Sequence, residues 1–448
     1  MSYDLVIKNG TLATPEATLK ANVGVKGGQI AAIASGPLDG EKVIDAKGLH
    51  VLPGLIDGHV HFRDPGLTYK EDFATGSQAA AAGGICTIID MPNTKPPLST
   101  AEAFREKASL GESKSCVDFG VVAVVVQDNV DRIPELATTG ILGYKIFMGE
   151  TVGAIPAPDD GAMLEAFGLI AKTGLRVGFH AENNQIMQHL IKRFKAQGRT
   201  DALAHLESRP EISEADAIQK VILFAQSTGA KVHIYHMSSR KGMELVATGK
   251  GAGVDVTAET GPHYLLLDGP SDMPRLKAML KMNPPVRGKE HGAALFKGLL
   301  DGSVDMIATD HSPHTLEEKL KENIWEAIPG FCGVETSVPL MLTQVNAGRL
   351  TLNQYVQVAS ENPARVWGMY PKKGRLAVGS DADFTLVDMK QEGVIRSERL
   401  HSRSQVSPFD GYKVKGLPVY TIVRGNVVMQ HGEVNPAPIG KLVTPQAR

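Results

Sequence analysis

The sequence predicts an α/β protein: a (β/α)8 TIM barrel with a small β-sandwich domain formed from both chain ends. Eight short apolar runs typical of buried strands follow one another between residues 53 and 371, and stretches with apolar residues at helical spacing separate them. Eight strand–helix units in about 320 residues are typical of this barrel. β-Prone segments at both chain ends predict the second domain.

The two chain ends share one pattern of short strands and glycine turns. It occurs in residues 3–9 and 22–35 near the start, and again in residues 383–388 and 419–428 near the end. We therefore expect residues 1–52 and 372–448 to form the β-sandwich together. Residues 53–371 would then form the barrel.

The expected barrel strands end at or near the following residues: His61, Asp90, Val126, Phe147, His180, His236, Glu259 and Asp310. Helical spacing is clearest in residues 75–82, 160–172, 215–227 and 288–300. A doubly wound open sheet is the alternative fold. No glycine-rich dinucleotide fingerprint follows the first strand, which disfavours this alternative.

Composition limits the kinds of partner. The 448 residues are 42% hydrophobic, and 47 basic and 49 acidic residues give a formal net charge of -2. This balance lacks the electrostatic footprint of a protein that binds nucleic acid or an anionic membrane, so we expect a small-molecule substrate. Three cysteines without CxxC spacing and a start without a secretory pattern predict a reduced, cytoplasmic protein. No apolar run reaches the ~18 residues of a membrane helix.

His59 and His61 lie two residues apart at the end of the first expected strand, so both imidazoles share one face. Such a pair alone is weak evidence, and a lone histidine at a strand end is more often a solvated side chain. Catalytic groups of such barrels, however, gather at the carboxyl ends of strands. Further candidates lie on later strands: Lys145, His180, His236 and Asp310. Six such residues on five strands predict a metal site.

Lys145 raises a chemical problem, because an ammonium group cannot bind a metal ion. Burial beside cations lowers a lysine pKa and favours the neutral amine, which can capture carbon dioxide as an anionic carbamate. A carbamate can bridge two metal ions about 3.5–4 Å apart, the usual separation in two-metal hydrolytic sites. The alternatives for Lys145 are a Schiff-base lysine and a salt-bridging lysine.

These motifs resemble those of the cyclic amidohydrolases of the amidohydrolase superfamily, which include dihydroorotases, allantoinases and hydantoinases. The resemblance runs nearly end to end through residues 53–61, 143–145, 180–183, 233–239, 308–313 and 379–383. It implies one divalent metal ion on His59, His61 and Asp310. It implies a second ion on His180 and His236, with carboxylated Lys145 as the bridge. Zinc is the expected metal, although this ligand set also accepts cobalt or manganese.

The chemistry that the resemblance implies is hydrolysis of a cyclic amide. The metal pair would lower the pKa of a bridging water and polarise the scissile carbonyl. Asp310 would be the catalytic residue that accepts the proton and returns it to the leaving nitrogen. The same groups would close the ring in the reverse direction.

The substrate is predicted from the residues around the expected metals. Arg63 follows His61 by two residues, and its guanidinium suits a substrate carboxylate bidentately. Dihydroorotate carries such a carboxylate, whereas allantoin and simple hydantoins do not. The resemblance to dihydroorotases implies that Arg63, Asn93 and His263 hold this group, and that Asn283 also contacts substrate. The expected function is therefore dihydroorotase, which interconverts dihydroorotate and N-carbamoyl-aspartate.

Several alternatives stay open. Segments 180–183, 207–210 and 407–411, together with Glu259, look more like allantoinases and hydantoinases, so allantoinase or hydantoinase/dihydropyrimidinase is the alternative function. Arg63 has Asp64 and Glu71 as possible ion-pair partners, and His263 has a place at a loop surface as its alternative. A non-catalytic scaffold relative is a remote alternative, because such proteins typically lose metal ligands and all six positions are filled here. The resemblance also implies a homo-oligomer, a dimer or tetramer.

Overall fold

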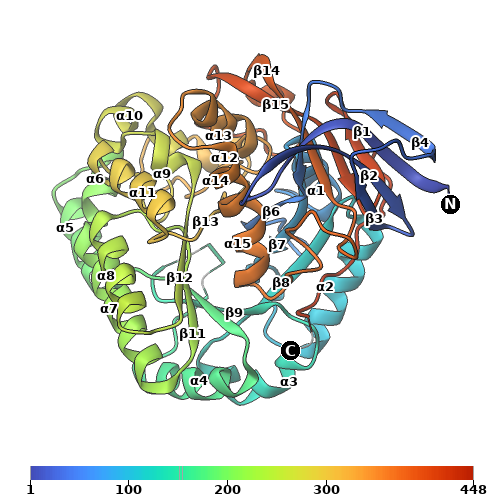
Figure 1. The fold of residues 1–448 in the computed structure, drawn as a ribbon. Helices are drawn as coiled ribbons and strands as arrows, with labels where there is room; N and C mark the ends of the chain where they lie inside the picture. The colour runs from blue at the N-terminus through green and yellow to red at the C-terminus, as the bar shows by residue number, and fades with distance from the viewer. Residues whose placement is uncertain (1, 151, 154, 447–448) are drawn as a thin grey trace.

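A computed structural model of the chain describes residues 2–150, 152–153 and 155–446. Its central feature is a sheet of eight parallel strands in which neighbours in sequence are neighbours in space (Figure 1). The strands are β6 (Leu55–Val60), β7 (Ile85–Asp90), β8 (Asp118–Val124), β9 (Gly143–Phe147), β10 (Arg176–His180), β11 (Lys231–Ile234), β12 (Val256–Thr260) and β13 (Met306–Ile307). This order is the one that the sequence predicts for a barrel.

The sheet closes nearly completely. Val60 at the end of β6 forms a parallel bridge with His311 beyond β13, and the His61 N–H donates to the His311 carbonyl over 2.8 Å. Every residue of β6 to β10 is buried, as expected for parallel strands that are covered on both faces. The (β/α)8 barrel is therefore confirmed, and the open sheet is excluded.

The last strand, β13, ends at Ile307 and thus earlier than the expected end near Asp310. The backbone N–H and the hydroxyl of Thr309 both donate to the Asp57 carboxylate, over 3.1 Å and 2.5 Å. These bonds replace the ladder to a neighbouring strand. The chain therefore turns away before Asp310, which has a positive φ of 47°.

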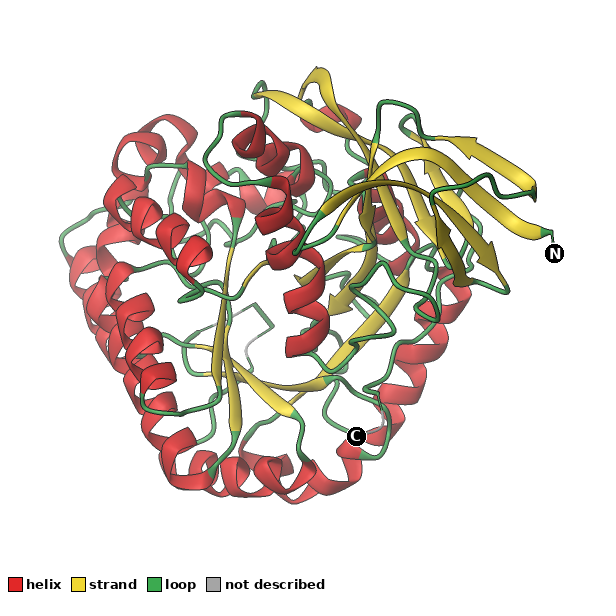
Figure 2. Ribbon diagram, viewed as in Figure 1, coloured by secondary structure: helices red, strands yellow, loops and turns green. Residues whose placement is uncertain are grey.

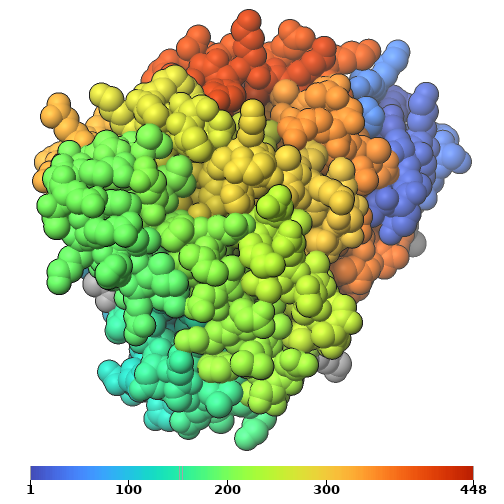
Figure 3. Space-filling model, turned by 90° about the vertical axis from the view of Figure 1, so that its left-hand side faces the viewer, coloured from blue at the N-terminus to red at the C-terminus, as the bar shows by residue number. Residues whose placement is uncertain are grey.

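Helices form a ring around the barrel strands (Figure 2). They are α1 (Phe73–Ala82), α2 (Ala101–Lys114), α3 (Ile133–Ala137), α4 (Asp160–Thr173), α5 (Asn184–Ala196), α6 (Ala202–Ser208), α7 (Glu211–Thr228), α8 (Arg240–Gly251), α9 (Pro262–Leu266), α10 (Gly269–Leu276), α11 (Lys289–Asp301), α12 (Leu316–Lys319), α13 (Ser337–Asn346), α14 (Leu352–Val356) and α15 (Asn362–Val366). The segment that includes α5, α7 and α8 covers one flank of the molecule (Figure 3). None of the described helices is long and apolar enough to cross a membrane.

Local sequence signals set the ends of these helices. Asp159 caps the start of α4, where its carboxylate accepts the Ala162 N–H over 2.9 Å. Gly174 and Gly229 end α4 and α7 in the left-handed conformation that glycine adopts without strain. The predicted helices 160–172 and 215–227 therefore end within a residue or two of the observed ends.

The two chain ends meet in one mixed nine-stranded sheet beside the barrel (Figure 2). Its strands are β1 (Tyr3–Ala13), β2 (Thr18–Lys26), β3 (Gln29–Ala34), β4 (Gly40–Asp45), β5 (His50–Pro53), β14 (Phe384–Val394), β15 (Lys413–Val423), β16 (Asn426–Gln430) and β17 (Glu433–Val434). Antiparallel pairing of β5 with β14 joins the two ends, with Val51 opposite Leu386. Apolar side chains from six of the strands pack into a separate core, which confirms a β domain built from both ends.

A buried ion cluster attaches this domain to the barrel. The Lys373 ammonium lies 2.5 Å from Asp118 at the start of β8, and 2.9 Å and 2.7 Å from Asp381 and Asp383. The three carboxylates lie close enough together to hold a metal ion. The Lys373 ammonium already lies among them and neutralises their charge, so the group is a structural contact.

Candidate metal centre

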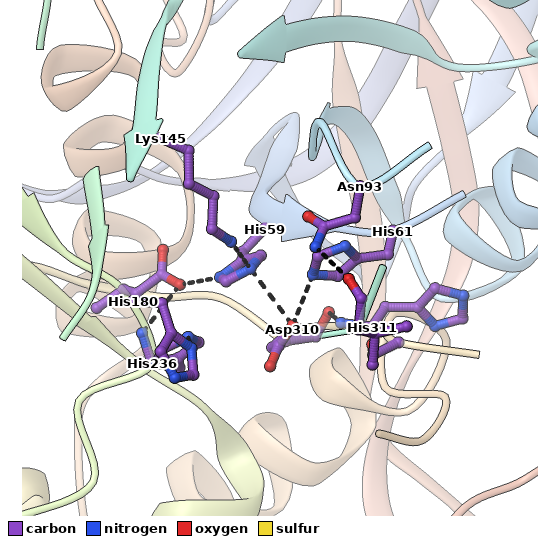
Figure 4. A network of polar contacts seen from close by, with 12 residues as sticks. His59, His61, Asn93, Lys145, His180, His236, Asp310 and His311 are labelled. Atoms are coloured by element: carbon purple, nitrogen blue, oxygen red, sulfur yellow. Dashed lines mark hydrogen bonds and ion pairs between the residues drawn. The ribbon is translucent and has the colours of Figure 1, made fainter. Parts of the chain in front are cut away.

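All but one of the predicted site residues line a single cleft at the carboxyl ends of the barrel strands. They are His59, His61, Arg63, Asn93, Lys145, His180, His236, Asn283 and Asp310. Figure 4 shows the imidazoles, the Lys145 amine and the Asp310 carboxylate converging from different strands. The expectation that catalytic groups lie at the carboxyl ends of barrel strands therefore selects residues that are far apart in the sequence and adjacent in the fold.

The first group of possible ligands comes from β6 and from the turn after β13. His61 Nε2 lies 3.0 Å from Asp310 Oδ1, and His59 Nε2 lies 3.3 Å from the same oxygen. The ligand atoms of these three residues all lie within 4.8 Å of one another, which is a spacing that a single metal ion can fill. Lys145 Nζ lies 2.9 Å from His59 Nε2, at the edge of this group.

The second group comes from the end of β10 and from the segment just after β11. His180 Nδ1 lies 3.0 Å from His236 Nε2, so two ring nitrogens face the same point. The His59 and His236 rings have their centroids 5.4 Å apart, which places the two groups side by side.

Strained backbone at the strand ends turns these side chains into the cleft. Arg63, His236 and Asp310 all have positive φ angles, of 62°, 38° and 47°. Residues other than glycine rarely adopt a positive φ, and those that do are often found at functional sites. The carboxylate of Asp57 holds the turn before Asp310 through its two bonds to Thr309.

Burial sets the charge of the possible ligands. It lowers the pKa values of His59, His61 and His236 well below the usual range, so these imidazoles are neutral and have a free lone pair. Burial also lowers the pKa of Lys145 to about 8 and raises the pKa of Asp310 to about 7. Neutral imidazoles with a carboxylate oxygen are a donor set that fits zinc and similar divalent ions.

Arg63 lies in the cleft without an acidic partner. Its guanidinium donates to the Ser312 hydroxyl over 2.7 Å, and Nε and one terminal nitrogen have no partner among the described residues. The two partners considered from the sequence are engaged elsewhere, since Asp64 pairs with Lys114 over 2.7 Å and Glu71 accepts from Ser402. Burial lowers the pKa of Arg63 only to about 10, so the group stays charged and free to bind a ligand.

Two amides add unpaired acceptors to the same cleft. The Asn93 side-chain NH2 donates to the Val152 carbonyl over 3.0 Å, which leaves its Oδ1 without a partner. Asn283 Oδ1 is also buried and has no partner among the described residues. The cleft therefore presents both a cationic donor and neutral acceptors.

His263 is the predicted residue that does not line this cleft. Its ring is buried and packs against Tyr264 and Phe331, with centroids 4.0 Å and 5.1 Å away. The ring folds back over Gly261, where an added Cβ would lie 2.4 Å from it. The loop-surface alternative is thus wrong, and a substrate contact by His263 stays a prediction.

Sequence reasoning assigned no role to two buried glutamates that contact the histidines. Glu182 Oε2 lies 2.8 Å from His180 Nε2, and Glu259 Oε1 lies 2.5 Å from His59 Nδ1. The pKa of Glu182 is lowered, because the nearby Arg209 guanidinium and His180 outweigh the effect of burial, whereas burial raises the pKa of Glu259. A signal existed in the sequence, since Glu259 ends the seventh expected strand.

A second cavity of about 320 Å³ opens beside the cleft and shares Val152, Asn283 and Pro329 with it. Cationic side chains of Lys195, Arg209 and Lys281 contribute to its lining. Apolar side chains such as Ile191, Trp325 and Ile328 form the rest of the lining, so the cavity is mixed in polarity.

Fold and site together define a (β/α)8-barrel protein with a candidate metal-binding centre at the strand ends. The sequence profile of the amidohydrolase family matches residues 50–428. The chain belongs to this family, within its cyclic amidohydrolase branch.

Relatives with three different activities are similar to this chain over nearly their whole length. An allantoinase of Deinococcus radiodurans is 40% identical and covers 100% of both chains. An L-hydantoinase of Paenarthrobacter aurescens is 39% identical over 96% of each chain, and a dihydroorotase of Methanothermobacter thermautotrophicus is 41% identical over 96% of this chain and 95% of its own. The solved L-hydantoinase (dihydropyrimidinase) from Arthrobacter aurescens has a TM-score of 0.96 at 38% identity, covering 99% of this chain and 100% of its own.

Proposed function

We propose that this protein is an allantoinase, which opens the five-membered ring of allantoin at a two-metal centre. The observation that carries the proposal is the mixed polarity of the cleft, which is lined both by the Arg63 donors and by the free acceptors of Asn93 and Asn283. The ureido substituent of allantoin carries both N–H donors and a carbonyl acceptor, so it matches both kinds of group. The full-length similarity to the allantoinase of Deinococcus radiodurans supports the same substrate.

Dihydroorotate, the substrate expected from the sequence, is the second candidate. The absence of an acidic partner for Arg63 among the described residues favours a substrate with a carboxylate. The carboxylate itself has no donor for the acceptor oxygens of Asn93 and Asn283, whereas the ureido substituent of allantoin has several. For this reason allantoin ranks first.

We propose that His59, His61 and Asp310 hold one divalent ion and that His180 and His236 hold the other, with zinc as the expected metal. When bound, such a pair lowers the pKa of water and polarises a carbonyl group. Lys145 would bridge the pair after its neutral amine forms a bond to the carbon of carbon dioxide and loses a proton. Its pKa of about 8 makes the neutral amine accessible near neutral pH.

Asp310 is the proposed general base and acid. It is buried and lines the cleft, and its carboxylate would take the proton from the attacking water and deliver it to the ring nitrogen as the C–N bond breaks. Arg63, Asn93 and Asn283 would hold the substituent and keep the scissile amide next to Asp310.

Initial rates with three substrates test the proposal: allantoin, dihydroorotate and 5-benzylhydantoin, all with metal-loaded protein. We expect the kcat/KM for allantoin to exceed that of each other substrate at least about tenfold. A higher value for dihydroorotate would replace the proposal with the second candidate. The highest value for 5-benzylhydantoin would indicate a hydantoinase, and turnover of none would exclude a cyclic ureide hydrolase.

A further inference from the structure

We propose that Glu182 and Glu259 are positioning residues, each of which fixes the ring nitrogen that one histidine presents to the metal centre. Glu182 acts on His180 and Glu259 acts on His59. The inference rests on the metal centre of the proposed function, and it extends that centre to residues outside the expected ligand set.

The bonds of Glu182 determine the tautomer of His180. Glu182 Oε2 accepts from the Arg209 guanidinium over 2.5 Å, and a guanidinium can only donate. This oxygen is therefore an acceptor, and the His180 Nε2 that lies 2.8 Å from it must carry the proton. His180 Nδ1 then has the free lone pair, and this nitrogen is the one that faces His236 Nε2.

Glu259 favours the other tautomer in His59, with the proton on Nδ1. Its Oε1 accepts the backbone N–H of His236 over 3.2 Å and lies 2.5 Å from His59 Nδ1. The Lys145 ammonium, which can only donate, lies 2.9 Å from His59 Nε2, so Nε2 has the lone pair and Nδ1 carries the proton toward Glu259. His59 therefore presents the lone pair of Nε2 toward Asp310. The other oxygen, Oε2, lies 3.2 Å from His233 Nε2, a contact that keeps the carboxylate from rotating away from His59.

The other two histidines of the centre have no such support. Nδ1 of His61 and Nδ1 of His236 are both buried and have no partner in the described part of the chain. Each expected metal position thus has one histidine fixed by a carboxylate and one histidine without one. Carboxylates behind metal-bound histidines set ring orientation and raise ligand basicity, and their loss typically weakens metal binding about 10–100-fold.

Metal binding to the purified chain tests this inference without substrate. We would measure zinc content by mass spectrometry and Co²⁺ affinity by titration in its visible absorption band. Glu182→Leu and Glu259→Leu remove the acceptor, and Glu182→Gln and Glu259→Gln retain an oxygen that can still accept. Glu214→Leu is the matched control, because Glu214 is buried and bonds to Ser238 but contacts none of the expected ligands.

We expect each leucine variant to bind one of the two metal ions about 10–100-fold more weakly than wild type and to have an altered Co²⁺ absorption spectrum. Glu214→Leu should keep both ions. The glutamine variants keep the acceptor but lose its charge, so their affinity should lie between those of the wild type and the leucine variants. If a leucine variant does not fold, a lower affinity of its glutamine counterpart than of Glu214→Gln supports the inference, and equal affinities overturn it.

Two further results separate this inference from the proposed function. Wild-type protein that binds two ions, with all variants equal to it or with Glu214→Leu equally weakened, would overturn the positioning role alone. Wild-type protein that binds fewer than two ions would contradict the proposed two-metal centre, and the positioning role with it.

Discussion

Lys145 Nζ lies 2.9 Å from Nε2 of His59, and no described carboxylate forms an ion pair with this lysine. The amine is buried beside the rings of Phe147 and Tyr235, with centroids 4.9 Å and 4.3 Å away. A salt-bridging role is therefore excluded within the described residues. A buried amine with a lowered pKa and no acidic partner is suited to capture carbon dioxide.

Replacement of Lys145 should abolish metal binding and turnover together. We expect Lys145→Ala to lose at least one metal ion per chain and about 10³-fold or more in kcat, because the bridging anion is absent. Metal content by mass spectrometry and the allantoin assay measure the two effects on one sample.

Bicarbonate provides the complementary test on the unchanged protein. Metal-free wild-type chain should take up metal more completely with bicarbonate than in carbon dioxide-free buffer, whereas Lys145→Ala should not respond. Retention of both metal and activity by Lys145→Ala would show that no carbamate is needed.

Arg63 should discriminate between the two candidate substrates. Arg63→Met is expected to lower kcat/KM for dihydroorotate about 10–100-fold, because a charged hydrogen bond contributes about 1.5–3 kcal/mol. The loss for allantoin should be smaller, since its neutral substituent also has Asn93 and Asn283 as partners.

Arg63→Lys is the control for charge alone, because it keeps the cation and loses the planar fork. An equal loss for both substrates in Arg63→Met would mean that Arg63 contacts the shared ring or supports the cleft. The substituent would then be recognised elsewhere.

The barrel and its ligand positions could be predicted because the information is local. Buried parallel strands are largely apolar, and each candidate ligand lies in the carboxyl-terminal part of such a strand or shortly after it, as His180 at the end of β10 and His236 after β11 do. The predicted ends of the strands were less accurate. The last one ends early because Thr309 bonds to Asp57, a residue 252 positions away.

Contacts across the barrel could not be predicted, because their partners are far apart in the sequence. Glu259 reaches His59 over 200 positions of sequence, and nothing near either residue marks the pair. For His263 the sequence indicates a loop after a strand but gives no ring direction. Packing against Phe331, which is distant in sequence, decides that direction.

His401 should make stability depend on pH. Its Nδ1 lies 3.0 Å from Glu335, and this hydrogen bond raises the pKa of His401 above 6.5 although partial burial opposes the shift. A raised folded-state pKa gives stability that is fully present below the unfolded pKa and is lost as pH rises through the folded pKa.

The free energy of unfolding of His401→Gln should therefore fall below wild type by about 0.5 kcal/mol near pH 5.5 and by almost nothing near pH 9. Urea unfolding at the two pH values measures this difference. An equal deficit at both values would indicate lost packing rather than lost charge.

Lys373 should contribute more to stability than any exposed lysine of the chain. Its ammonium is the central cation among Asp118, Asp381 and Asp383, and all four side chains are buried. Lys373→Met removes this cation. Arg424 then remains as a partner of Asp118, at 3.0 Å, but it forms no ion pair with the other two carboxylates.

Removal of one partner from a buried ion cluster costs about 3–5 kcal/mol, so Lys373→Met should lower the free energy of unfolding by about that amount. Lys372→Met is the matched control, because the neighbouring side chain is exposed and should change stability by less than about 0.5 kcal/mol. Guanidinium unfolding monitored by circular dichroism measures both variants. If Lys373→Met is as stable as Lys372→Met, then protonation of the aspartates or entering water relieves the repulsion, and the cluster does not fasten the β domain to the barrel.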